Sequence, residues 1–263
     1  PEFEDEDHYL KLNTEVYGGP ILNTWFDRPL TLAGRVSFLK DGKLKNTNIN
    51  FEDPLMIIPN LAIHLNRDVN KGQKIDKQKD LIPIMKTIQK DEEIEGYLMD
   101  LLAEKIGVKS DSIMDFDLYL RDTEDPIIMG SEEEFLNAGQ IDDLGMAHAG
   151  LKALLNSEKP NFNLLVLFDN EEIGSNTDVG ADSPLLSNLL ERIVYALEGT
   201  RSDYLQIIEN TFMVSADMAH AVHPNHADKH DPTNQPVINQ GPVIKISSNR
   251  RYTTDSYSGG YIK

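Results

Sequence analysis

A short apolar run that ends in carboxylates constrains the fold more than any other part of this chain. The run is 164–168, and it is followed by Asp169, Glu171, Glu172 and a glycine. An apolar run of this length, closed by a polar turn, is typical of a buried strand in an α/β sheet. Ligands of such sheets bind just beyond the carboxyl ends of the strands. The sequence therefore predicts that these three carboxylates lie where chemistry takes place.

The same carboxylates indicate a site for a bound cation. Adjacent carboxylates repel each other and resist ionisation unless a cation neutralises them. One glutamate can then bind metal while its neighbour moves a proton. Asp142 precedes a predicted helix and Asp217 ends a second apolar run, so both could share a cation, or a pair of cations, with Glu172. Spacing alone leaves the alternative open that all of these carboxylates cap helices or face water.

The charge and the residue composition limit the partners and the metal ligands that the chain can have. The chain has 263 residues, with 44 acidic against 25 basic side chains and a net charge of −19, which disfavours nucleic acid and anionic membranes as partners. Because cysteine is absent, a metal site must use Asp, Glu and His, a set that suits zinc, manganese or cobalt. Neither a membrane-length apolar run nor a signal peptide is evident, so the sequence predicts a cytoplasmic protein.

The chain divides into two predicted domains, 1–132 and 133–263. The first is β-rich, with strands around 35–39 and 114–120, a hairpin turn at 40–43 and a helix over 91–106. The second alternates helices with strands, which implies an α/β fold with a parallel sheet. Its predicted helices are 144–155, 183–197 and 202–209, and its predicted strands are 164–168, 211–217 and 243–246.

Several motifs resemble one known family, the aspartyl aminopeptidase family of metallopeptidases, which is aminopeptidase I-like. They are Thr24–Arg28, Leu61–Leu65, Asp169–Ser175, Ser215–Asn225 and Gly241–Lys245. The motifs occur in the family's order and span nearly the whole chain.

The resemblance implies a fold and an activity. The fold would be the α/β catalytic core of a dinuclear zinc exopeptidase with a parallel-type sheet, preceded by a β-rich dimerisation domain. The activity would be release of N-terminal residues, acidic ones (Asp or Glu) above all, from peptide substrates. The cofactors would be two divalent metal ions, zinc in most members, with manganese or cobalt as alternatives. The partners would be further copies of the chain, in dimers that assemble into a dodecamer.

The resemblance also assigns roles to the metal-binding and proton-transfer residues. Asp142 matches the aspartate that bridges the two metal ions. Glu172 would bind one ion and Asp217 the other. Glu171 would be the general base for hydroxide attack on the scissile carbonyl, and it would pass the proton to the leaving amine.

Four further residues match positions that contact substrate. His220 would contact the substrate or its tetrahedral intermediate, while Lys245 and Tyr252 match positions near the acidic side chain or the intermediate. His64 matches a histidine that reaches into the active site of a neighbouring subunit. Trp25 and Phe26, in contrast, are interpreted as core or interface residues. His223, His226 and His230 are interpreted as part of a polar loop.

Some positions depart from the family pattern. Gln140 and Asp143 stand where the family commonly has arginine and asparagine, and Asp143 adds negative charge beside the bridging position. Two metal-binding histidine motifs of the family have no match, so the chain resembles the middle of a longer protein and this segment alone is expected to bind metal weakly. The alternatives are a catalytically inactive oligomeric assembly protein, or an aminopeptidase that prefers neutral or apolar first residues.

Overall fold

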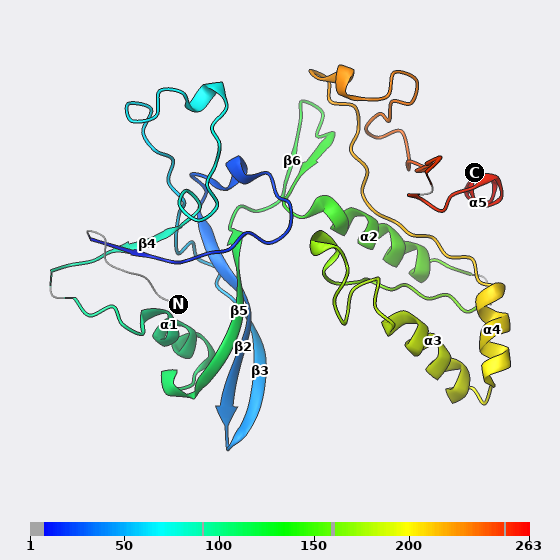
Figure 1. Ribbon diagram of the computed structural model, residues 1–263, viewed down its shortest axis with the longest axis horizontal. Helices are drawn as coiled ribbons and strands as arrows, with labels where there is room; N and C mark the ends of the chain where they lie inside the picture. The colour runs from blue at the N-terminus through cyan, green and yellow to red at the C-terminus, as the bar shows by residue number, and fades with distance from the viewer. Residues whose placement is uncertain (1–7, 91, 159–160, 250) are drawn as a thin grey trace. The chain divides into compact units, whose positions relative to one another are not determined.

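The chain forms two compact units. A computed structural model describes residues 8–90, 92–158, 161–249 and 251–263 (Figure 1). One unit comprises the chain up to Gly139 together with Phe168–Tyr204, and the other comprises Gln140–Leu167 together with Leu205–Lys263. This division is discontinuous along the chain, whereas the sequence predicts a single boundary after residue 132, and that boundary stays a prediction. None of the described helices is both long and apolar enough to cross a membrane.

A three-stranded antiparallel sheet organises the first unit. Its central strand, β2 (Leu30–Lys40), lies between β3 (Lys43–Asn50) and β5 (Ile113–Asp122). Asp41 and Gly42 join β2 to β3 with φ values of 54° and 71°. Two left-handed residues match the right-handed twist of a hairpin, which explains the Asp-Gly pair at this turn. The predicted hairpin and the predicted strand 114–120 are therefore confirmed.

The hydrophobic core lies between this sheet and one helix. Leu30, Leu32 and Val36 occupy one face of β2, because side chains alternate along a strand, and each is at most 1% exposed. Helix α1 (Tyr97–Ile106) buries Leu98 and Leu102 in the same cluster. The other buried members are Leu12, Ile49, Met56, Ile58, Ala103 and Ile113, and partly buried Trp25 and Phe26 pack against them. Trp25 and Phe26 are interpreted from the sequence as core or interface residues, and their packing on this cluster supports the first of the two.

Helix α1 begins later than the sequence predicts. A helix over 91–106 is expected, but the structure starts it at Tyr97, and Asp91 lies outside the described residues. Glu92 instead closes a turn, because its carboxylate accepts a hydrogen bond from the Gln89 amide at 2.9 Å and pairs with Lys86. The predicted end is confirmed: Gly107 has φ 69°, and its amide donates to carbonyls of the last turn.

Smaller elements complete the chain. Strand β1 (Tyr9–Lys11) pairs with β4 (Ile84–Thr87), and β6 (Ile127–Met129) pairs with β7 (Phe135–Asn137), both antiparallel. The remaining α-helices are α2 (Ile141–Leu155), α3 (Leu185–Ala196), α4 (Arg201–Glu209) and α5 (Ser256–Ile262). Short 3-10 helices are η1 (Leu22–Trp25), η2 (Val69–Lys71), η3 (Ser110–Ser112), η4 (Glu171–Ile173) and η5 (Ala227–Lys229). Helices α2, α3 and α4 confirm the three helices predicted after residue 133.

Helix α2 is the centre of the second unit. Two glycines allow other segments to approach it closely: a Cβ on Gly145 would lie 2.8 Å from Met218 Sδ, and one on Gly150 would lie 2.8 Å from Leu165 Cδ1. The segments around Leu165 and Met218 therefore pack directly on the helix. This packing brings residues near 217 to the beginning of α2, where Asp142 lies.

The three predicted strands 164–168, 211–217 and 243–246 are wrong as local assignments. Each is irregular in the described chain and has no strand partner. An apolar run becomes a strand only where a neighbouring backbone completes the hydrogen-bond ladder. Leu164 and Leu167 are also 44% and 65% exposed here, so the run lacks the burial on both faces that the prediction assumed.

Candidate metal centre

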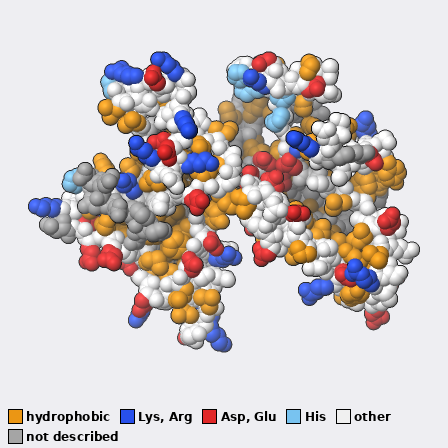
Figure 2. Space-filling view, in the orientation of Figure 1, with side chains coloured by type: hydrophobic (Ala, Val, Ile, Leu, Met, Phe, Trp, Pro, Cys, Tyr) orange, Lys and Arg blue, Asp and Glu red, His pale blue; other side chains and the backbone are white. Residues whose placement is uncertain are grey.

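Three aspartates of the second unit form a cluster. Oxygen atoms of Asp142, Asp143 and Asp217 all lie within 4.8 Å of one another. Two of these residues come from the first turn of α2 and the third from the segment that packs on that helix. Figure 2 shows acidic side chains gathered over the beginning of α2. The cluster brings together two predicted metal ligands, Asp142 and Asp217, that lie 75 positions apart in the sequence.

The backbone at the start of α2 is irregular. Gln140 has φ 59°, and Asp142 and Asp143 have non-helical dihedral angles. Regular helical geometry starts only after them. The two neighbouring aspartates can therefore both offer an oxygen to the same small volume, whereas consecutive residues of a regular helix point in different directions.

Lys245 binds the same cluster. Its Nζ donates to Asp217 Oδ2 at 2.7 Å and to the Met218 carbonyl at 3.5 Å. The ammonium also lies 5.6 Å from the centre of the Tyr252 ring, within the range of a cation–π contact. The hydrogen bond to Asp217, together with that carboxylate's charge, raises the pKa of Lys245. Lys245 is thus a charged partner of a predicted metal ligand.

Asp143 is an aspartate of the cluster whose pKa is raised. Partial burial raises its pKa, and the charges of Asp217 and Asp142 raise it further, while Lys245 and the Met218 amide act in the opposite direction. Carboxylates that crowd together favour a shared proton or a bound cation. The sequence noted Asp143 only as a departure from the family pattern and did not predict it as a ligand. Its position beside Asp142, the predicted bridging residue, is the signal that could identify it.

The residues of the cluster fit a divalent cation. Carboxylate oxygens are ligands that magnesium and manganese prefer, and zinc also accepts them at about 2.0–2.2 Å. Across the described residues, no histidine joins these three aspartates in a group close enough to share one ion. The donor set within this unit therefore consists of oxygen atoms alone.

The predicted Glu171 and Glu172 lie in the first unit, on η4. Asn170 shapes their loop: it has φ 62°, its side-chain oxygen accepts from Thr177 Oγ1 at 2.8 Å, and its carbonyl accepts from the Ser175 amide at 2.9 Å. Asparagine tolerates the left-handed conformation well, which explains its place before the two glutamates. The loop thus holds both glutamates on one short turn.

The segment around Tyr17 and Gly18 supports that turn within the same unit. The Asn170 side-chain amide donates to the Tyr17 hydroxyl at 3.0 Å. A Cβ on Gly18 would lie 3.0 Å from the Glu172 carbonyl oxygen and 3.2 Å from Glu172 Cβ. Glycine at this position therefore allows the backbone to pack against one of the predicted metal ligands.

The predicted histidines lie elsewhere. His64 is exposed on a turn of the first unit, and His220 lies in the second unit with its ring centre 5.1 Å from that of His230. His223 and His226 form a second ring pair at 4.9 Å. Of these four residues, His223, His226 and His230 belong to the loop that the sequence predicts as polar. The roles of His64, His220 and Tyr252 in substrate binding stay predictions.

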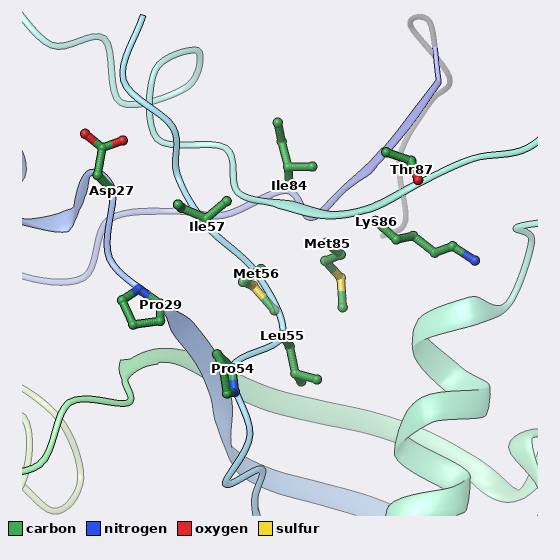
Figure 3. Close-up of a pocket in the computed structure, with 10 residues that line it drawn as sticks. All are labelled: Asp27, Pro29, Pro54, Leu55, Met56, Ile57, Ile84, Met85, Lys86 and Thr87. Carbon is green, nitrogen blue, oxygen red and sulfur yellow. The ribbon is translucent and has the colours of Figure 1, made fainter.

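An apolar hollow in the first unit is lined by none of the predicted site residues. It has a volume of about 480 Å³ and is lined mainly by side chains of 54–57 and 84–87 (Figure 3). Two ionisable residues border it, and both have partners: Asp27 accepts from Asn60, and Lys86 pairs with Glu92. The aspartate cluster of the second unit is therefore the stronger candidate for chemistry.

The chain combines helices and sheets with a carboxylate cluster that fits a divalent cation, the combination expected of a metal-dependent α/β enzyme. Comparison with known proteins identifies the family. The model of the family described as aminopeptidase I zinc metalloprotease (M18) matches residues 2–263. The chain belongs to this family, and the resemblance seen in its motifs is confirmed.

Relatives and solved structures agree with that assignment. A probable M18 family aminopeptidase 2 of Clostridium acetobutylicum is 51% identical over 261 residues, which cover 98% of this chain and 60% of the relative. The structure of an Ape4 and Nbr1 complex matches with a TM-score of 0.88 and 36% identity, covering 98% of this chain and 53% of that one. The structure of an S. cerevisiae mApe1 dodecamer matches with a TM-score of 0.67 and 26% identity, covering 90% and 55%. The predicted α/β fold class is confirmed by these neighbours.

Proposed function

We propose that this chain is the metal-dependent part of an aminopeptidase that releases N-terminal residues, with a preference for acidic ones. The observation that carries the proposal is the cluster of Asp142, Asp143 and Asp217 within 4.8 Å, in a chain of a zinc metalloprotease family. The chain spans about 60% of the length of its Clostridium relative. The activity, the substrates and the oligomeric assembly of the protein are therefore all proposed.

The predicted metal ligands would keep the roles that the family resemblance gives them. Asp142 would bridge two ions, Asp217 would bind one and Glu172 the other, and Asp143 would add a further oxygen. Zinc is the metal that the family description names, with manganese and cobalt as alternatives for an oxygen-rich donor set. When bound, such ions would polarise the scissile carbonyl and lower the pKa of a water molecule.

Proton transfer would fall to Glu171. A general base must lose and regain a proton within one cycle, so it is best kept apart from the ligands that hold metal. Glu171 would take the proton from the attacking water and deliver it to the leaving amine. Its neighbour Glu172 would hold metal, and the turn of η4 would fix the two side chains in different directions.

Substrate preference would depend on the cation beside the cluster. Lys245 and Tyr252 lie together, with the ammonium 5.6 Å from the ring centre. A lysine ammonium in this position would pair with the carboxylate of an acidic first residue. His220 would contact the scissile group.

The protein would act as a homo-oligomer. The solved mApe1 structure is a dodecamer, and we propose dimers of this chain that assemble in the same way. His64, exposed on its turn, would complete the active site of a neighbouring copy. Light scattering of the purified protein tests the assembly, and a monomer with full activity would refute the role of His64. The net charge of −19 is consistent with a cytoplasmic enzyme free of nucleic acid and membrane.

The test is metal-dependent hydrolysis. The protein is dialysed against a chelator, supplied with zinc, manganese or cobalt, and assayed with peptides that begin with Asp, Glu or Leu. We expect metal to restore release of the first residue, and acidic substrates to give the highest kcat/KM. Release of Leu alone would replace acidic specificity with a preference for apolar residues.

Matched variants separate catalysis from structure. Asp217→Asn removes a ligand of the cluster, whereas Asp228→Asn changes an exposed aspartate that pairs only loosely, at 3.9 Å, with Lys229. We expect the first to reduce kcat/KM by at least about 100-fold, as loss of a metal ligand commonly does, and the second to change it little. If no metal and no substrate gives activity while the protein still assembles, the protein is an inactive assembly protein.

A further inference from the structure

Lys245 and the predicted metal ions compete for the same carboxylate. The Lys245 ammonium donates to Asp217 Oδ2 at 2.7 Å, and Asp217 is one of the three aspartates whose oxygens lie within 4.8 Å. The lysine side chain is 29% exposed and that of Asp217 is 52% exposed. All of these residues belong to one compact unit, so the contact is a property of that unit alone.

The charges do not balance while the lysine is the cation. Three ionised carboxylates carry −3, and the single ammonium leaves −2. Within the described part of the chain, the ammonium donates its hydrogen bonds to Asp217 and to the Met218 carbonyl, and neither Asp142 nor Asp143 accepts one from it. A divalent ion carries twice the charge and, at this spacing, can contact oxygens of all three aspartates.

An ammonium and a divalent ion on one carboxylate repel each other. The repulsion acts at a separation of a few ångströms and is only partly screened at a half-exposed site. The lysine can move away from Asp217 because its four-carbon side chain is flexible, and the Tyr252 ring, 5.6 Å from the ammonium, is a second group that it can contact. Exchange of one cation for the other therefore requires a side-chain movement and no change in the backbone.

We infer that Lys245 is the resident counter-cation of the aspartate cluster, and that a divalent ion displaces its ammonium from Asp217. The displaced ammonium then faces the substrate, where it can pair with an acidic side chain. The lysine thus couples metal loading to substrate selection: without metal it neutralises Asp217, and with metal it becomes available to a carboxylate. The second half of this inference rests on the proposed function.

Metal affinity is the decisive measurement. Zinc and manganese are titrated calorimetrically into chelator-treated protein, with circular dichroism to verify folding. Lys245→Met removes the competing charge and retains the apolar side chain, so we expect metal to bind about five- to tenfold more tightly, which corresponds to the loss of one partly exposed ion pair and its repulsion. Lys245→Arg keeps the charge and can pair with Asp217 through two hydrogen bonds, so we expect weaker binding than in the wild type.

The control is Lys229→Met. Lys229 is 77% exposed and pairs with Asp228, outside the cluster, so its loss changes the net charge equally without removing a competitor. We expect an affinity within about twofold of the wild type, since surface charges are largely screened. If Lys229→Met tightens binding as much as Lys245→Met, net charge alone explains the effect and the inference is wrong.

Weaker metal binding by Lys245→Met than by the wild type would also overturn the inference. If metal binds more weakly, the lysine supports Asp217 as a ligand and does not compete with the ion. If wild-type protein binds no metal at all, the proposed function fails, and the inference fails with it. If wild-type protein binds metal and the variants follow the expected order, yet no peptide is hydrolysed, the inference holds and only the proposed function fails.

Discussion

Gly18 and Gly19 are adjacent, yet substituting them should have very different effects. Gly18 has φ 69°, and a Cβ there would meet the Glu172 carbonyl oxygen at 3.0 Å and Glu172 Cβ at 3.2 Å. A Cβ on Gly19 would meet no described atom within 4 Å, and Gly19 does not have a positive φ. Only Gly18→Ala therefore combines backbone strain with a collision against a predicted metal ligand.

The magnitude follows from two contributions. A left-handed conformation costs a residue with a Cβ roughly 1–2 kcal/mol. The contact with a backbone carbonyl is tighter than normal packing, and the turn that carries Glu172 must shift by a few tenths of an ångström to relieve it. We expect Gly18→Ala to lower the free energy of unfolding by about 1–3 kcal/mol and Gly19→Ala to change it by less than about 0.5 kcal/mol.

Two assays check this pair. Urea denaturation of the chelator-treated proteins measures stability, and kcat/KM for an Asp-peptide in the presence of metal measures the effect on Glu172. Because misplacement of a metal ligand by less than 1 Å can reduce rates strongly, we expect at least about a tenfold loss for Gly18→Ala only. Equal stability and equal activity for the two variants would show that Gly18 does not support the turn of η4.

Three further predictions follow from burial and charge. Leu102→Ala removes a fully buried core side chain and should destabilise the protein by about 2–5 kcal/mol, whereas Leu44→Ala, at a 67% exposed position, should have little effect in the same denaturation assay. Asp143→Asn should raise the Tm of metal-free protein near pH 7, because a raised pKa means that folding disfavours the ionised form; the gain should disappear as the pH falls below the ordinary Asp value of about 4. The pKa of Lys245 is raised by its contact with Asp217, so this lysine stabilises the fold fully at pH values below its ordinary pKa of about 10.4. That stabilisation should be lost as the pH rises through the raised pKa. Lys245→Met should abolish this loss of stability at alkaline pH.

Local sequence signals predicted the first unit well. The Asp-Gly turn, the alternating strand of β5 and the glycine that ends α1 each depend on the conformational preferences of a few adjacent residues. Such signals are readable because the cause and the structure lie within the same short segment. The start of α1 was missed because Glu92 makes side-chain hydrogen bonds in a turn, which compete with the helix.

The predicted strands of the second unit failed for a non-local reason. The run 164–168 has the right composition, but strand formation depends on a neighbouring backbone that no feature of the run itself specifies. The carboxylates at the ends of these runs were nevertheless informative. Asp217 meets Asp142 because its segment packs on α2 through Gly145, and not because a strand delivers it. The predicted proximity of Asp142 and Asp217 is thus confirmed, although the predicted strand 211–217 is wrong.

The contact between Lys245 and Asp217 shows that motifs identify functional residues more easily than they identify which of those residues touch. Asp217 and Lys245 each stand in a recognisable motif, but the two residues lie 28 positions apart and nothing in the sequence between them indicates their contact. A nearby cation lowers the repulsion within a cluster of like charges. Lys245 offsets one of the three negative charges of the aspartate cluster. If a divalent ion displaces the ammonium from Asp217, as inferred above, Lys245 sets the strength of metal binding without being a ligand itself.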